Sequence, residues 1–77
     1  MSIDHEKFAY ELASTLRDKE ALPLYREFVR IYQEDFLRKI LLRVMSIPDE
    51  KIRRTRGALF TFLVRQNGWS FRIDARD

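Results

Sequence analysis

The sequence predicts an all-α protein, a small bundle of about four helices with a short extended C-terminal tail. Apolar residues recur at the three- and four-residue spacing of a buried helical face through most of the chain. The composition agrees, because 45% hydrophobic and 35% charged residues with only two glycines and two prolines are typical of a compact helical chain. A chain of 77 residues is expected to form one domain, residues 1–77. The expected helices cover approximately residues 4–17, 22–33, 35–46 and 49–66, and the tail covers 67–77.

The first helix is expected to begin near residue 4. Ser2 and Asp4 are candidate N-caps, because their side-chain oxygens can accept from the free backbone N–H groups of a first turn. The segment "RDKEALP" ends this helix, and Pro23 suits the first turn of the next one. The apolar face of the first helix consists of Phe8, Ala9, Leu12, Ala13 and Leu16.

Residues 23–46 contain two apolar runs with a weak break at "QED" between them. A single helix over 23–46 is therefore one interpretation. Two helices are favoured, because one helix of that length leaves a small domain unable to fold its apolar stripe back on itself. Glu34 and Asp35 then lie in the first turn of the third helix, where the helix dipole favours acids. The two runs are Leu24, Tyr25, Phe28, Val29 and Tyr32, then Phe36, Leu37, Ile40, Leu41 and Val44.

The fourth helix is expected after Pro48, and its apolar arc covers about half of its circumference, which is typical of a core helix. Arg56 falls inside that apolar arc, an unfavourable place for a cation in a continuous helix. The alternative is a break in which Thr55 caps a new helix beginning at Arg56. Gly57 lowers helix propensity by roughly 1 kcal/mol relative to alanine, so it indicates either this break or a close approach.

The C-terminal segment has a different pattern. Asn67 and Gly68 suit a helix C-cap, and Trp69, Phe71 and Ile73 then alternate with polar residues at a strand-like period. A hairpin over residues 61–73, turning at Asn-Gly, is the rival interpretation. We favour a tail that packs Trp69 and Phe71 across the bundle, because an isolated hairpin is marginally stable.

The sequence lacks the residues that several kinds of catalytic or metal-binding site require. The chain has no cysteine and a single histidine, His5, which leaves no usable zinc site and no base for a serine nucleophile. No glycine-rich phosphate loop occurs. We therefore expect no enzymatic activity and no cofactor. No apolar run approaches the roughly 20 residues that span a bilayer, and "MSIDHEKFAYEL" lacks signal-peptide features, so we expect a cytoplasmic protein without membrane contact.

Charge is distributed unevenly along the chain. Residues 1–35 carry five basic and eight acidic side chains, whereas residues 36–77 carry ten and four. Basic groups in the third and fourth helices are expected to form one stripe around Pro48 that binds phosphates with weak sequence preference. The first hypothesis is therefore a nucleic-acid-binding accessory or regulatory module. The expected phosphate contacts are Arg38, Lys39, Arg43, Lys51, Arg53, Arg54, Arg56 and Arg65.

The second hypothesis is a protein-interaction or homodimerisation module without nucleic-acid contact. Small residues between cations let another helix approach closely, and exposed aromatic residues in a tail can add to a partner. The expected interface residues are Gly57, Thr61, Trp69 and Phe71.

The patterns "ELASTLRDKEALPLY", "DFLRKIL" and "IPDEKIRRTRGALFTFLV" resemble a short all-helical segment of bacterial and mobile-element proteins. The resemblance covers residues 11–64, and "RGALFTFLV" is its most distinctive part. Similar segments often carry proline where this chain has Gln33, which supports a helix break there. The resemblance implies a helical module and an association with DNA-handling systems, without a role for any individual residue.

Overall fold

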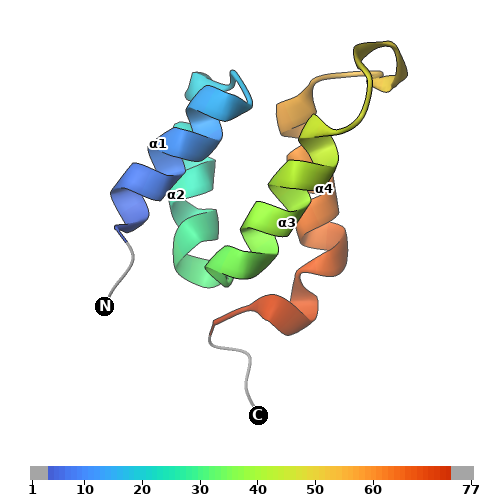
Figure 1. Ribbon diagram of the computed structural model, residues 1–77. Coiled ribbons are helices and arrows are strands. Elements are labelled where there is room, and N and C mark those ends of the chain that lie inside the picture. The colour runs from blue at the N-terminus through green and yellow to red at the C-terminus, as the bar shows by residue number, and fades with distance from the viewer. Residues whose placement is uncertain (1–3, 74–77) are drawn as a thin grey trace.

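The computed structural model describes residues 4–73 and shows a four-helix, all-α architecture (Figure 1). Helices α1 and α2 pack mainly against each other, as do α3 and α4. No helix in the described range is long and apolar enough to cross a membrane. The helices are α1 (His5–Thr15), α2 (Leu22–Ile31), α3 (Glu34–Met45) and α4 (Arg56–Asn67), with 3-10 turns η1 (Lys19–Ala21), η2 (Asp49–Lys51) and η3 (Trp69–Phe71).

Helix α1 begins and ends with recognisable caps. The Asp4 carboxylate accepts a hydrogen bond from the Lys7 backbone N–H at 3.1 Å, which confirms Asp4 as the N-cap. The other candidate, Ser2, lies outside the described residues. The helix ends two residues earlier than expected, because Arg17 adopts a left-handed conformation with φ of 54°. The Asp18 N–H then donates to the Ala13 carbonyl at 2.9 Å, which fixes Asp18 beside the end of the helix.

The break between α2 and α3 is confirmed at Tyr32 and Gln33. Both have extended backbones, with ψ of 153° and 143°. The Gln33 N–H donates to the Phe71 carbonyl at 2.9 Å, and Tyr32 forms an isolated antiparallel bridge with Arg72. The C-terminal segment therefore satisfies backbone groups that a continuous helix would have paired internally.

Helix α4 begins at Arg56, so the expected single helix over 49–66 is wrong and the alternative break is confirmed. The Thr55 hydroxyl caps the helix by accepting from the Ala58 N–H at 3.0 Å. Before it, Asp49–Lys51 forms a separate 3-10 turn and Ile52 is extended. Arg56 itself donates to the Val44 carbonyl at 2.6 Å and to the Asp49 carboxylate, which explains a cation on the inner side.

The C-terminal segment differs from both interpretations. The hairpin over 61–73 is wrong because α4 continues to Asn67, and the strand-like alternation is wrong because Trp69–Phe71 is a 3-10 turn. Phe71 stacks on Phe36 with ring centroids 4.7 Å apart, whereas Trp69 is 75% exposed and does not pack across the bundle. Only one of the two aromatic residues is therefore packed, and residues 74–77 of the expected tail lie outside the described range.

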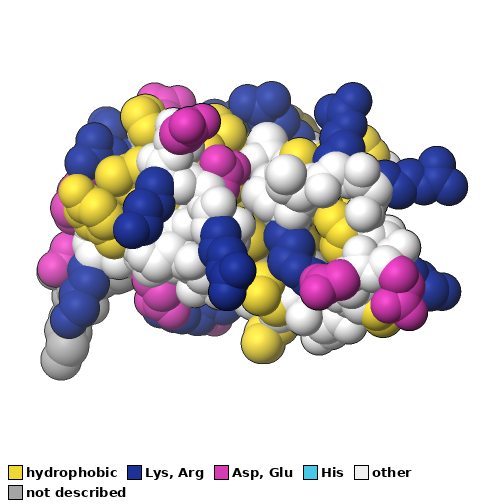
Figure 2. All heavy atoms as spheres, turned by 90° about the horizontal axis from the view of Figure 1, so that it is seen from above, with side chains coloured by type: hydrophobic (Ala, Val, Ile, Leu, Met, Phe, Trp, Pro, Cys, Tyr) yellow, Lys and Arg dark blue, Asp and Glu magenta, His cyan; other side chains and the backbone are white. Residues whose placement is uncertain are grey.

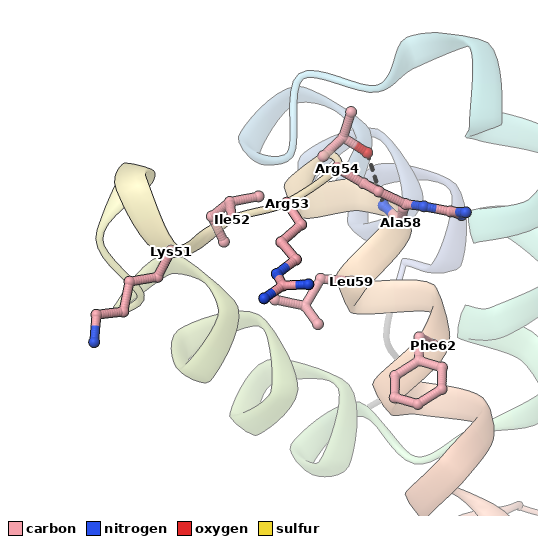
Figure 3. Close-up of a pocket in the computed structure, with 8 residues that line it drawn as sticks. Lys51, Ile52, Arg53, Arg54, Ala58, Leu59 and Phe62 are labelled. Atoms are coloured by element: carbon pink, nitrogen blue, oxygen red, sulfur yellow. Dashed lines mark hydrogen bonds between the residues drawn. The ribbon is translucent and has the colours of Figure 1, made fainter.

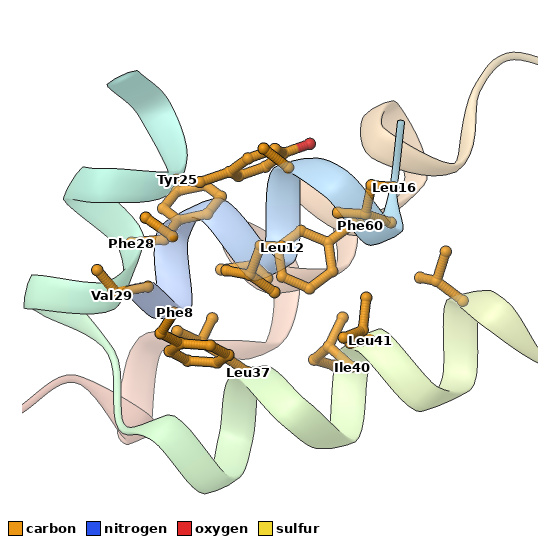
Figure 4. Packing of buried hydrophobic residues seen from close by; sticks show 14 of the residues in the cluster. Phe8, Leu12, Leu16, Tyr25, Phe28, Val29, Leu37, Ile40, Leu41 and Phe60 are labelled. Atoms are coloured by element: carbon orange, nitrogen blue, oxygen red, sulfur yellow. The ribbon is translucent and has the colours of Figure 1, made fainter. Parts of the chain in front are cut away.

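One hydrophobic cluster joins all four helices (Figure 4). Phe60 of α4 contacts Tyr25 and Phe28 of α2 with ring centroids 5.8 and 6.3 Å apart, and Leu12 of α1 lies beside it. The two helix pairs therefore share one core. The buried members are Phe8, Ala9, Leu12, Ala13, Leu16, Tyr25, Phe28, Val29, Phe36, Leu37, Ile40, Leu41, Val44, Phe60 and Val64.

Candidate nucleic-acid interface

Arg38 is paired with acidic side chains of the fold, although its own side chain is 43% exposed. Its guanidinium donates to Glu34 at 2.7 Å within α3 and to Glu11 of α1 at 3.1 Å. It also lies 4.4 Å above the ring of Phe8. The hydrogen bonds that Arg38 donates to Glu11 and Glu34 raise its pKa, so the group stays charged. Arg38 therefore joins α1 to α3, and the prediction that it contacts phosphate is not supported by this geometry.

Arg56 is the second expected phosphate contact that the fold uses internally. Its side chain is 19% exposed and forms an ion pair with Asp49. It also donates to the Val44 carbonyl at the end of α3, which accepts a longer hydrogen bond from the Ile47 N–H at 3.3 Å as well. Arg56 therefore fastens the α3–α4 connection to the start of α4, and part of its set of N–H donors is engaged within the fold.

The other six expected cations make no ion pair within the described residues. Viewed onto the end of the bundle, dark-blue side chains lie over both the left and the right parts of the surface, and yellow and magenta side chains lie between those at the right (Figure 2). These six are Lys39, Arg43, Lys51, Arg53, Arg54 and Arg65, and all of them are exposed.

Three of these cations line a hollow of about 460 Å³ at the start of α4 (Figure 3). Lys51, Arg53 and Arg54 form its basic part, and Figure 3 shows Arg53 beside Leu59 with Phe62 one turn further along α4. The remaining lining residues are Ile52, Thr55, Ala58, Leu59 and Phe62, so the hollow is apolar between its cations. Such a combination attracts an anion and also offers it apolar contact.

A second hollow of about 430 Å³ lies between α4 and the segment that begins α2. Arg54 and Arg65 line it, together with the acidic Asp18 and with Leu24, Thr61 and Phe62. The two hollows share four lining residues, Arg54, Thr55, Ala58 and Phe62. We name the shared region with its four cations, Lys51, Arg53, Arg54 and Arg65, the Phe62 surface. Lys39 and Arg43 lie on α3 and line neither hollow.

Phe62 is the residue of this surface that the sequence pattern did not single out. Its side chain is 57% exposed, although the wide apolar arc suggested a core position. Once α4 is known to begin at Arg56, its buried stripe consists of Gly57, Phe60 and Val64. Phe62 lies nearly opposite that stripe at about 100° of rotation per residue. Because the angle between Phe62 and this stripe is the same wherever the helix begins, the missing information was which face of α4 packs against the core, and a single sequence does not contain it.

Of the four expected interface residues, Gly57 and Thr61 lie together in the lining of the second hollow. Gly57 is buried and faces the Asp18–Tyr25 pair, so it is not presented to a partner. Thr61 is half-buried in the second hollow. Trp69 and Phe71 lie beyond the C-terminus of α4, where Trp69 is exposed and Phe71 packs on Phe36. The structure therefore does not bring these four residues together on one face.

Within the described range, no group of three or more acidic, histidine or cysteine residues is arranged so that it could hold a metal ion. Comparisons of the chain with protein-family profiles, curated proteins and solved structures found no match. The resemblance to bacterial and mobile-element segments therefore has no support beyond the residues quoted for it. What the Phe62 surface binds has to be inferred from its own chemistry.

Proposed function

We propose that the protein is a nucleic-acid-binding accessory or regulatory module that contacts phosphates through the four cations of the Phe62 surface. The observation that carries this proposal is that Lys51, Arg53 and Arg54 line one hollow and form no ion pair in the described residues. Unpaired guanidinium groups bind phosphate oxygens with two parallel hydrogen bonds. The charge surplus of residues 36–77, ten basic against four acidic, favours the approach of a polyanion.

The proposed binding is weakly sequence-specific and non-catalytic. Phosphate contacts set position and affinity, whereas sequence is read by polar side chains at base edges. The groups around Arg53 and Arg54 are mainly apolar, so they offer few donors or acceptors for reading a base edge. The proposal also includes a cytoplasmic location, because a chain without cysteine fits a reducing compartment.

The test is binding to a fluorescent duplex and a fluorescent single strand of equal length across a salt series. Four phosphate contacts predict a slope of log K against log salt of about −2.8 for a single strand, at roughly 0.7 per contact. The variant Arg53→Ala/Arg54→Ala should bind more weakly, with a slope smaller by about 1.4.

Lys7→Ala/Arg30→Ala is the matched control, because both side chains are exposed, form no ion pair in the described range, and lie on α1 and α2. This variant loses the same charge and should keep most of the binding. The proposal fails if neither strand binds at low salt. It also fails if the two double variants lose affinity equally, because binding would then depend on net charge alone.

A protein-interaction role is the second candidate, and the exposure of Trp69 favours it. An exposed tryptophan is a frequent anchor in protein interfaces, and Phe71 and Ile73 beside it in sequence are 42% and 49% exposed. If this group forms a homodimer, the mass measured by light scattering should double with concentration in wild type and stay monomeric in Trp69→Ser. A monomeric wild type at every concentration tested removes self-association from consideration.

A further inference from the structure

The Phe62 surface combines two features that a duplex and a single strand use differently. A duplex presents phosphates outward and keeps its bases stacked inside, so an exposed aromatic side chain gives it little extra contact. A single strand exposes base faces as well as phosphates. Proteins that bind single strands place aromatic side chains among cations so that bases stack while phosphates are neutralised.

Phe62 has this position. Phe62 is 57% exposed and lines both hollows, with Lys51 and Arg53 in the lining of the first and Arg65 in the lining of the second. Arg54 lines both hollows. The first hollow is about 460 Å³, within the usual size range of small-ligand sites, and Ile52 and Leu59 add apolar surface to it.

The other exposed aromatic residues lack these surroundings. Tyr10 on α1 and Trp69 beyond α4 are each at least half exposed, yet neither lines either hollow of the Phe62 surface. Exposure of a single aromatic side chain is ordinary. The distinguishing feature of Phe62 is its place among four cations that form no ion pair in the described range, although Asp18 lines the second hollow with Arg54 and Arg65.

We infer that the ligand is single-stranded nucleic acid, with one base stacked on Phe62 in the first hollow and the flanking phosphates bound by Arg53, Arg54 and Arg65. This inference rests on the proposed function and adds the class of ligand. Phosphate attraction supplies most of the affinity, and stacking selects strands that have free bases.

The decisive experiment compares three fluorescent ligands of equal length at one salt concentration: a thymidine single strand, an abasic strand with the same phosphates, and a duplex. Wild type should bind the thymidine strand roughly tenfold more tightly than the abasic strand, since stacking on an aromatic residue changes affinity about five- to 150-fold. Phe62→Ala and Phe62→Leu should lose this preference while their binding to the abasic strand stays unchanged.

Phe62→Leu separates stacking from simple apolar contact, because leucine keeps an apolar side chain without a π face. Tyr10→Ala is the matched control, since Tyr10 is similarly exposed and should leave all three affinities unchanged. Arg53→Ala/Arg54→Ala should weaken the thymidine and abasic strands by the same factor. Circular dichroism of each variant checks that the exposed substitutions leave the fold intact.

The inference is overturned if wild type binds the abasic strand as tightly as the thymidine strand, if Phe62→Ala keeps the preference, or if the duplex binds more tightly. A glutamate peptide of equal charge that binds as well as the thymidine strand also overturns it, and assigns the surface to acidic proteins. Binding of none of the three nucleic acids is a different result, because it removes the proposed function itself.

Discussion

Gly57 is a glycine because the side chains of Asp18 and Tyr25 leave no room for a Cβ there. A Cβ added there would lie 2.8 Å from the Tyr25 hydroxyl and would collide with the Asp18 carboxylate. The Tyr25 hydroxyl donates to that carboxylate at 3.1 Å. Burial, and then the negative charge of Asp18, raise the pKa of the Tyr25 phenol, so it stays protonated as the donor. The first turn of α4 can therefore approach this pair only without a side chain at Gly57.

Gly57→Ala should lower the free energy of unfolding by about 1 to 2 kcal/mol. Relieving the collision requires Asp18 to turn away, which leaves the buried Tyr25 hydroxyl without an acceptor, a loss of about 1–3 kcal/mol. The better helix propensity of alanine offsets up to about 1 kcal/mol of this. In a Tyr25→Phe background the hydroxyl is gone, so the same substitution should be neutral or should stabilise the fold by up to about 1 kcal/mol.

Urea unfolding followed by circular dichroism measures both effects. An equal loss of stability in the two backgrounds would show that the Asp18–Tyr25 pair is not the reason for the glycine.

The sequence shows which residues are basic, but it does not show which acidic residues they contact. Arg38 and Arg53 look alike in a helical pattern, yet Arg38 meets Glu11 from another helix. That contact depends on how α1 and α3 pack, which a single sequence does not contain. Arg56 was partly recognisable, because a cation on an apolar arc needs a partner or a helix break. The structure provides both, the break at Thr55 and the partner Asp49.

At the scale of elements, the helices with local start and stop signals were the ones predicted most closely. Asp4 caps α1, and Thr55 caps α4 as the alternative interpretation proposed. The break after α2 has no proline or glycine, and its backbone is completed by Phe71, about forty residues away in sequence. This long-range pairing explains why local signals at "QED" were weak.

The end of α4 shows the same limit. Gly68 is the C-cap, as its position after Asn67 indicated, but its φ of −84° is open to any residue. Its small size is required because a Cβ would collide with the Val64 carbonyl and with the Tyr32 ring. The alternating aromatic pattern that follows indicated a strand, whereas the contact of Phe71 with Phe36 and the pairing with Gln33 favour a 3-10 turn. In this segment, the contacts with the rest of the fold decided the backbone conformation, and the alternating sequence pattern did not.

At the scale of the molecule, the two helix pairs share one core rather than forming two independent hairpins. Phe60 is fully buried in α4 and contacts Tyr25 and Phe28 of the other pair. A chain of this length has a total stability of roughly 4–12 kcal/mol at about 0.05–0.15 kcal/mol per residue. Losing one large side chain at the junction of the pairs is therefore expected to affect all four helices.

Phe60→Ala should lower the free energy of unfolding by about 3–5 kcal/mol, because it removes apolar contact and leaves a cavity. Since the core is shared, amide hydrogen exchange should rise by the same factor at Leu12 of α1 and Val64 of α4, both fully buried. Leu42→Ala is the control, because Leu42 is exposed and should change stability by less than about 0.5 kcal/mol. Faster exchange in α3 and α4 alone, with α1 and α2 still protected, would contradict a shared core. It would also show that the Phe62 surface can open without unfolding the rest of the molecule.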